Sequence, residues 1–524
     1  MNIGDAPLVT EIEERLRPLV VAAEAAWWDA AVDARDETEA RRKTTDLAVS
    51  DVLAEPELFG AVRAARSQAG LDPTVARQLD VVHDWLAPNQ VPSELRRAIV
   101  DLQVAVESEF AQHRGEVDGE QVDDNEITEI LRTSDDVGLR ERAWEASKTI
   151  GAAVADRLRE LARRRNEAAR ALGWRDHFAL ALGTSELDED RLFATLTAVD
   201  DATAAPFRAW KSQLDVRLAD RFGIAVRELA PWHYDDPFFQ TAPVGELADL
   251  DAVFAGRDLE ALVVRSYEGL GLDVAPVLTR SDLYPRERKN QHAFCTDIDR
   301  EGDVRVLCNI TPSERWMETL LHEFGHGTYF AEVDRTLPWT LRTMHSLTTE
   351  GVAMLFGRRS RDPEWLTTVV GVAPAEVERR AGALADARRA QLLVFARWVL
   401  VMTNFERGLY ADPNADHDNR WWELVERFQL VHRPPGRVGP DWAAKIHLAV
   451  APVYYQNYLY GELVASQVEA MLRREHGGLV DRPDVGRTLR DRIFRPGAAV
   501  RWDELIRRAT GEPLTPKHLA AQLA

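Results

Sequence analysis

Residues 322–326 of this 524-residue chain read His-Glu-Phe-Gly-His. Apolar side chains recur at helical spacing from Trp316 to Tyr329, which predicts a helix around this motif. Two histidines four residues apart lie on one helix face, so the imidazoles of His322 and His326 can reach one metal ion. Glu323 would then lie beside the metal, where a carboxylate can take a proton from water. The stretch predicts a helical fold organised around a metal site.

The start of this helix has its own signal in residues 311–314, which read Thr-Pro-Ser-Glu. The pattern is that of a capping box, with Thr311 as the cap and Glu314 three residues later. Gly325 and Gly327 are the weak points of the helix, since glycine costs about 1 kcal/mol relative to alanine there. We therefore expect another part of the backbone to approach closely near the metal.

A third metal ligand is expected at Glu350, which follows His326 after 23 intervening residues, near the start of a second helix at Ser346. This carboxylate would complete the three-ligand set that a catalytic zinc ion uses while keeping one position open. The alternative is an ordinary first-turn carboxylate that interacts with the helix dipole. Both motifs together favour one Zn²⁺ per chain, which cobalt or manganese could replace in vitro.

Composition limits the possible partners. Hydrophobic residues make up 45% of the chain and charged residues 29%, as in ordinary soluble proteins. The net charge of −22 argues against nucleic acid and anionic membranes as partners. The N-terminus lacks the basic region of a targeting segment, and the apolar run Leu392–Phe405 is too short to span a bilayer. We expect a cytoplasmic protein.

The two cysteines, Cys295 and Cys308, flank the dipeptide Glu301-Gly302. A tight hairpin turn at that dipeptide would place the cysteines directly opposite one another. They could then form a disulfide, although reduced thiols are expected in a cytoplasm. Two cysteines are too few to form a zinc site.

Helical periodicity dominates the rest of the chain. The expected helices are Thr10–Val32, Leu95–Glu109, Leu139–Leu172, Asp190–Phe222, Pro374–Arg407 and Gln456–Arg474. Strand signal concentrates around Phe294–Cys308. We therefore predict a mainly α fold with two helical lobes around a deep central cleft and one small hairpin beside the metal helix.

A single catalytic domain over residues 1–524 is expected. The helical region of about 1–230 would contribute to one lobe and a lid, and the metal and substrate site would occupy about 280–470. The edge strand of the hairpin could hold an extended peptide through its main chain. Alternatively, the hairpin only supports the core.

With His322, Glu323, His326 and Glu350 in place, residues 280–470 resemble the angiotensin-converting enzyme family of zinc peptidases. They resemble the thimet oligopeptidase and neurolysin group more distantly. The upstream segment Asn290–Phe294 carries a His-Ala pair similar to one on the substrate-binding strand of the first family. The resemblance implies that His292 hydrogen-bonds a substrate carbonyl and that Ala293 pairs with the substrate backbone.

A third similar stretch lies near the C-terminal end of this region. The resemblance implies that His447 donates a hydrogen bond to the oxyanion or the substrate carbonyl, and that Lys445 binds a C-terminal carboxylate. A tyrosine after His447 would stabilise the same oxyanion. We favour Tyr458 as this donor and Tyr455 as a carboxylate ligand, and an assignment that uses Tyr454 stays open.

Four departures from the family leave the metal ligands intact. Counting strictly from His447, the family's first tyrosine falls on Tyr454 and its second on Asn457, whereas one inserted residue gives Tyr455 and Tyr458. Met354 lies four residues after Glu350, where the animal enzymes have an aspartate that orients a metal-binding histidine, so another acceptor must orient it. Thr349 replaces a histidine. Asn457 or Gln456 lies where those enzymes have a chloride-binding arginine, which argues against chloride activation.

These features favour a zinc-dependent metallopeptidase that hydrolyses short peptides, in particular a peptidyl dipeptidase that releases C-terminal dipeptides. An internally cutting oligopeptidase and a single-residue carboxypeptidase are the alternatives within this chemistry. A non-catalytic zinc or peptide-binding protein is the alternative of a different class, and His345 could be its fourth ligand. Such a site has no need of Glu323.

Overall fold

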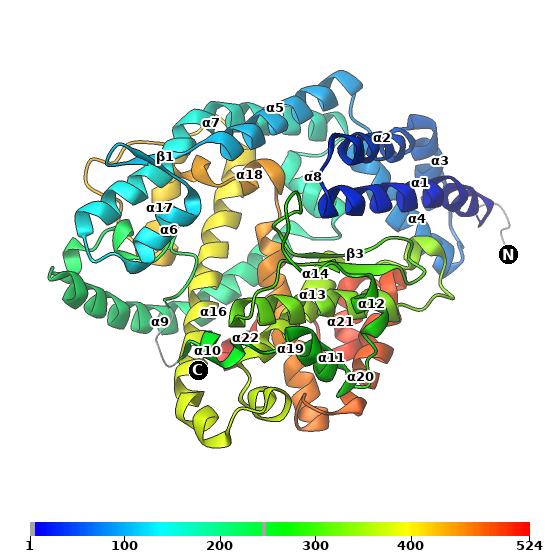
Figure 1. Cartoon of the computed structure of the whole chain (residues 1–524). Helices are drawn as coiled ribbons and strands as arrows, with labels where there is room; N and C mark the ends of the chain where they lie inside the picture. The colour runs from blue at the N-terminus through cyan, green and yellow to red at the C-terminus, as the bar shows by residue number, and fades with distance from the viewer. Residues whose placement is uncertain (1–5, 244–247, 524) are drawn as a thin grey trace. The chain divides into compact units, whose positions relative to one another are not determined.

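Helices form most of the computed structural model, which describes residues 6–243 and 248–523 (Figure 1). The predicted mainly α class is confirmed. In these residues the strands form two antiparallel hairpins, β1 (Gly115–Val117) with β2 (Glu120–Val122) and β3 (Phe294–Asp297) with β4 (Val304–Leu307). None of the helices described here combines the length and apolar character needed to cross a membrane.

The chain divides into two compact units, each assembled from segments far apart in the sequence. The first unit comprises Met1–Gln90, Glu246–Leu384 and Tyr460–Leu519. The second comprises Val91–Gly245, Ala385–Leu459 and Ala520–Ala524. The N-terminal helical region of about 1–230 is thus divided between the units. Three helices run across a boundary between the units: α16 (Pro374–Ala411), α19 (Tyr455–His476) and α22 (Lys517–Gln522).

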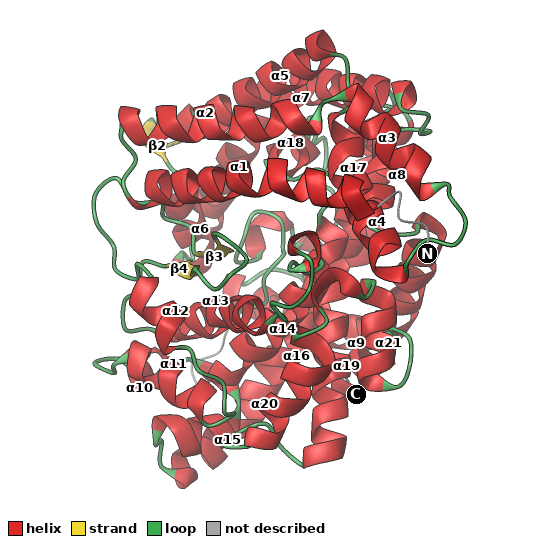
Figure 2. Ribbon diagram, turned by 90° about the vertical axis from the view of Figure 1, so that its right-hand side faces the viewer, coloured by secondary structure: helices red, strands yellow, loops and turns green. Residues whose placement is uncertain are grey.

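The first unit holds the metal motif and the hairpin β3–β4. Its helices are α1 (Ala6–Val32), α2 (Asp36–Leu53), α3 (Pro56–Arg66), α4 (Pro73–Leu86), α10 (Asp251–Phe254), α11 (Leu259–Glu268), α12 (Ala275–Arg280), α13 (Glu314–Glu332), α14 (Ser346–Gly357), α15 (Pro363–Trp365), α20 (Pro483–Leu489) and α21 (Trp502–Thr510). Leu16 of α1, Val62 of α3 and Val82 of α4 share a core with Trp339. Trp28 of α1 packs on Leu307 of β4, so this helix also contacts the hairpin (Figure 2).

The second unit is built around two long helices that lie side by side, α5 (Ser93–Gln112) and α7 (Val137–Ala171) (Figure 1). Its other helices are α6 (Asp124–Thr133), α8 (His177–Thr184), α9 (Glu189–Phe222), α17 (His417–Gln429) and α18 (His447–Val450). Both α6 and β1 pack on α7. The hairpin β1–β2 was not predicted from the sequence.

The register of β3–β4 corrects the prediction for the cysteines. Cys295 pairs with Val306, so Cys308 lies two residues beyond the position opposite it. The reason is the turn, because the side chain of Asp299 accepts hydrogen bonds from the N–H groups of Glu301 at 2.7 Å and of Asp303 at 3.0 Å. This makes a longer loop than a two-residue turn. Both thiols are free, as expected.

Candidate metal centre and substrate cavity

Helix α13 begins two residues later than predicted. Ser313 is its cap, and its Oγ accepts a hydrogen bond from the Trp316 N–H at 3.4 Å. Glu314 does not reach back to complete a capping box, because its carboxylate accepts hydrogen bonds from Ser360 and Arg361 at 2.7 Å each. The metal helix is therefore anchored at its first turn to the segment after α14.

Close packing on both sides of α13 explains the two glycines of the motif. A Cβ at Gly325 would lie 2.9 Å from Cα of Ala353 in α14, which is backbone that cannot easily move. A Cβ at Gly327 would lie 3.3 Å from a side-chain carbon of Val277 and 3.7 Å from one of Val304. The predicted close approach near the metal motif is confirmed.

Three predicted ligands lie together between α13 and α14. Nε2 of His322 is 3.8 Å and Nε2 of His326 is 3.5 Å from the two carboxylate oxygens of Glu350. One ligand atom from each of the three residues falls within 4.8 Å of the others. This group could hold a metal ion.

Glycine also makes room for the carboxylate ligand. A Cβ at Gly461 of α19 would lie 3.1 Å from Cγ of Glu350, so α19 packs directly against this side chain. Gly351 of α14 packs against the same helix, because a Cβ there would lie 2.4 Å from Cγ1 of Val464. The packing of α19 against α14 therefore restricts the orientation of the Glu350 side chain.

The protonation states suit metal binding. Burial lowers the pKa of His322 to about 4, so its ring is neutral and can donate a lone pair. Burial alone would raise the pKa of Glu350, but nearby His326 and His322 bring it below its ordinary value. Two histidines and one carboxylate are a ligand set that zinc accepts. The residues present therefore fit such an ion.

Glu323 lies beside this group and is only 8% exposed. Burial raises its pKa to about 7, His326 opposes this rise, and Glu350 adds to it. A carboxyl group with a pKa near the working pH exchanges protons readily, as a general base must.

His326 also has a hydrogen-bond partner for its second ring nitrogen, Nδ1. Its Nδ1 lies 2.7 Å from Oγ1 of Thr349. Thr349 was not predicted to have this role, although Met354 in place of an aspartate indicated that another acceptor was needed. His345, considered as a further ligand, lies outside the group, and its Nδ1 accepts a hydrogen bond from the Leu347 N–H at 3.2 Å at the start of α14.

The His-Ala pair lies directly before β3, in the hairpin that packs on α13. His292 is exposed, and its N–H donates to the side chain of Asn290 at 2.9 Å. Ala293 is half-buried and immediately precedes the first residue of β3. Their contact with a substrate stays a prediction.

The remaining predicted residues form a second group, which lies in the second unit. Lys445 Nζ donates a hydrogen bond to Oε1 of Gln240 at 2.9 Å and lies 5.2 Å from the centre of the Trp398 ring. The ring of His447 is 4.9 Å from that of Tyr455. The contact between Gln240 and Lys445 was not predicted from the sequence.

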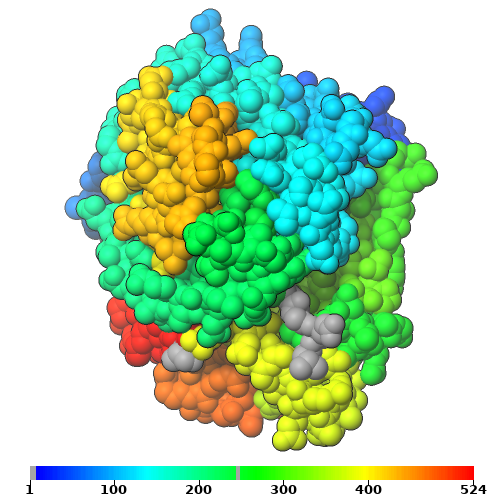
Figure 3. All heavy atoms as spheres, turned by 90° about the vertical axis from the view of Figure 1, so that its left-hand side faces the viewer, coloured from blue at the N-terminus to red at the C-terminus, as the bar shows by residue number. Residues whose placement is uncertain are grey.

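Of this group, Lys445, His447 and Gln240 border a cavity of about 220 Å³ within the second unit. Phe238 and Asp124 of α6 also lie on its wall. The lining residues fall in three stretches of the chain, 110–150, 237–240 and 444–447. These stretches meet on the face that Figure 3 shows, where they are cyan, green and orange. Amide, ammonium and imidazole groups therefore converge on one concave surface.

The tyrosines after His447 differ in exposure. Tyr455 is buried, with burial raising its pKa, whereas Tyr454 and Tyr458 are half-buried. The ring of Tyr458 is 5.7 Å from that of Tyr455 and 5.1 Å from that of Tyr454. All three tyrosines thus lie in one aromatic cluster, and the prediction that distinguishes their roles remains open to experiment.

Buried polar groups fix the segment that follows Lys445. The guanidinium of Arg165 donates to the carbonyls of Leu448 at 2.9 Å and Ala449 at 2.6 Å. Glu406 accepts a hydrogen bond from the N–H of Val453 at 2.7 Å, where the backbone φ is 55°. Such bonds to an irregular segment replace the regular pairing that a helix would provide.

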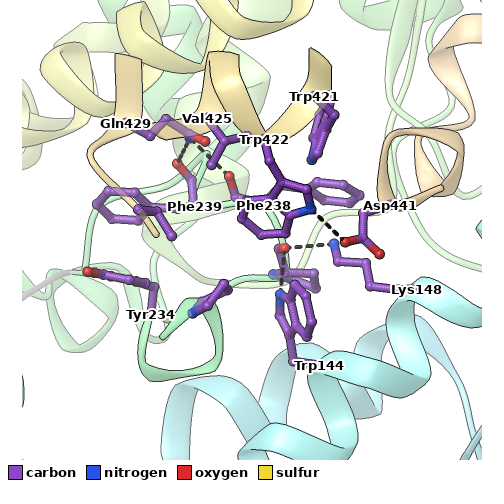
Figure 4. A pocket seen from close by; sticks show the side chains of 13 residues that line it. Trp144, Lys148, Tyr234, Phe238, Phe239, Trp421, Trp422, Val425, Gln429 and Asp441 are labelled. Atoms are coloured by element: carbon purple, nitrogen blue, oxygen red, sulfur yellow. Dashed lines mark hydrogen bonds between the residues drawn. The ribbon is translucent and has the colours of Figure 1, made fainter. Parts of the chain in front are cut away.

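A second pocket, lined by aromatic side chains, shares Pro237 and Phe238 with this cavity (Figure 4). Lys148 Nζ donates to the carbonyl of Pro237 at 2.7 Å and lies 3.4 Å from the centre of the Phe238 ring. Trp144 donates to the same carbonyl at 3.1 Å. Burial lowers the pKa of Lys148 to about 7. These hydrogen bonds hold the carbonyl of Pro237, three residues before Gln240.

No protein-family model matches the chain, and no curated protein matches its sequence. The resemblance to the zinc peptidases therefore stays a prediction that rests on the residues quoted above.

Proposed function

We propose that the chain is a zinc-dependent peptidase of the cytoplasm that acts on short peptides. One observation carries the proposal, namely that His322, His326 and Glu350 converge while the buried carboxyl group of Glu323 lies beside them. Histidine and carboxylate ligands with an adjacent glutamate are the parts of a metal-assisted hydrolase.

In the proposed reaction, the bound ion supplies Lewis acidity. Glu323 takes the proton from the attacking water and later delivers it to the leaving amine. His447 and Tyr458 would donate hydrogen bonds to the oxyanion, as the resemblance implies. His292 and Ala293 would bind the substrate's backbone, which lets the enzyme accept varied side chains.

We further propose that the cavity beside Lys445 binds the free C-terminus of the substrate. An ammonium group held by Gln240 among aromatic rings offers a charged donor to a carboxylate. Tyr455 would add a second donor, with Tyr454 as the alternative. This favours release of C-terminal dipeptides over internal cutting or removal of single residues.

The competing class is a zinc protein without catalysis. Structural zinc sites are closed by four protein ligands. In the residues described here the group has three members, and Glu323 has no ligand role in it. Both features favour a catalytic site.

The decisive experiment compares wild-type protein with Glu323→Gln. The variant should retain bound zinc and lose peptide hydrolysis by roughly 10²–10⁴-fold, because only the base is removed. Glu332→Gln is the matched control, since Glu332 lies at the end of the same helix and pairs with Arg490 at 2.7 Å. The measurement is zinc content together with mass spectrometry of peptide products.

The products also separate the alternatives. Chelator-sensitive loss of two C-terminal residues supports the dipeptidase, internal cuts indicate an oligopeptidase, and loss of one residue indicates a carboxypeptidase. Full activity in Glu323→Gln would refute the mechanism. Absence of any cleavage in zinc-loaded wild-type protein would favour the non-catalytic class.

A further inference from the structure

Two consecutive residues of α14 face the two nitrogens of one imidazole ring. Nε2 of His326 lies 3.5 Å from Oε2 of Glu350, and Nδ1 lies 2.7 Å from Oγ1 of Thr349. The adjacent Thr348 has a different partner, because its hydroxyl donates to the carbonyl of His345 at 2.8 Å. The hydrogen bond to His326 is thus specific to one of two neighbouring threonines.

The chemistry of imidazole gives this hydrogen bond a consequence. A neutral ring carries one proton, and the nitrogen that binds a metal must be the one without it. When an ion binds Nε2 of His326, the proton of the neutral ring is on Nδ1, where the oxygen of Thr349 can accept it. Rotating the ring by half a turn would place a carbon against this oxygen and lose the bond.

We propose that Thr349 is the positioning residue that fixes the rotation and the proton of His326, and thereby the affinity of the metal site. The inference rests on the proposed function only for the presence of the ion. In many metal sites a carboxylate has this role. Here Met354 offers no carboxylate at the expected position, and a neutral hydroxyl one residue before the ligand Glu350 takes its place.

The ligand Glu350 and the positioning residue Thr349 are adjacent in the same helix. Glu350 and Thr349 are covalent neighbours, so any movement of α14 displaces both relative to α13. A hydroxyl can also donate as well as accept, whereas an ionised carboxylate can only accept. Thr349 can therefore keep the ring of His326 in place both before and after the ion binds.

The test uses the full chain, stripped of metal, and measures zinc affinity by competition with a chelating indicator. Thr349→Val keeps the shape of the side chain and removes the hydroxyl, and should bind zinc about 10- to 100-fold more weakly. Thr349→Ser restores the hydroxyl and should bind within a few-fold of wild type. Thr348→Val is the matched control and should leave zinc affinity unchanged.

Thermal unfolding of each metal-free variant separates positioning from folding. An unchanged midpoint for metal-free Thr349→Val, combined with weaker zinc binding, supports the proposal. Equal zinc affinity in Thr349→Val and wild type overturns it and leaves the metal site standing. An equal loss of affinity in Thr348→Val also overturns it, because the effect would then come from α14 as a whole. If wild-type protein binds no zinc, the proposed function fails first.

Discussion

The side chain of Lys445 is half-buried and carries a charge that can be titrated near neutral pH. Burial lowers its pKa to about 8, and the more distant charges of Asp236 and Asp124 partly offset this effect. An anionic group from a substrate could form a charge-assisted hydrogen bond with this ammonium group.

Replacing Lys445 by alanine should therefore distinguish substrates by their C-termini. For free-acid peptides we expect KM to rise about 10- to 100-fold, which corresponds to the loss of a hydrogen bond to a charged group. For the same peptides with an amidated C-terminus, KM should stay unchanged. Equal effects on both kinds of substrate would refute the assignment of Lys445 as a carboxylate ligand.

The same residue predicts a dependence on pH. The ammonium is charged below its pKa and neutral above it, so KM for free-acid peptides should increase as pH rises through about 8. Amidated peptides should lack this increase, and so should the alanine variant with any substrate. Steady-state kinetics between pH 6 and pH 10 would check all three expectations.

At the scale of elements, the contact between α13 and α14 determines the metal site. Gly325→Ala would introduce a methyl group 2.9 Å from Cα of Ala353 and force the two helices apart. We expect a loss of about 1–3 kcal/mol in stability and weaker zinc binding, since Glu350 would move away from the two histidines.

Gly382→Ala in α16 is the control for helix propensity, because a Cβ there meets open space. That variant should be neutral or stabilised by up to about 1 kcal/mol. Thermal unfolding and zinc competition on both variants provide the measurement. Wild-type zinc affinity in Gly325→Ala would show that the two helices can separate without disturbing the ligands.

The sequence predicted long helices well, because their apolar period reports burial directly. Pro374–Arg407 was expected and α16 covers Pro374–Ala411, while Asp190–Phe222 was expected and α9 covers Glu189–Phe222. The metal ligands were also predictable, since spacing within one helix brings two of them together. In these cases the information is local in sequence.

Features that depend on side-chain contacts were harder to predict. The register of β3–β4 follows from hydrogen bonds to Asp299, and the start of α13 follows from the ion pair of Glu314 with Arg361. Gln240 reaches Lys445 across 205 residues of sequence, which no periodicity reports. For β1–β2, the dipeptide Asp118-Gly119, with positive φ at both residues, was an available turn signal.

At the scale of the molecule, the metal ligands all belong to the first unit. An ion that binds the folded form and not the unfolded form stabilises the structure by about 2.7 kcal/mol at a concentration of 100 times Kd. Adding zinc should therefore slow amide exchange in α13 and α14 by up to about 100-fold, with a smaller effect in α5 and α7 of the second unit.

Hydrogen exchange followed by mass spectrometry checks this expectation. A sample with chelator is the reference, and magnesium, which prefers oxygen ligands, is the control ion. Protection in α5 and α7 equal to that in α13 would show that the ion acts on the whole chain and contradict a site confined to the first unit.

The discontinuous make-up of the first unit has a consequence for synthesis of the chain. Its first segment ends at Gln90 and its last begins at Tyr460, so the whole of residues 91–459 is made in between. At about 5–20 residues per second, the first segment leaves the ribosome roughly 20–70 s before its final partner exists. During that time the apolar faces of its helices are incompletely covered, and such exposed apolar surface makes a newly made chain prone to aggregation.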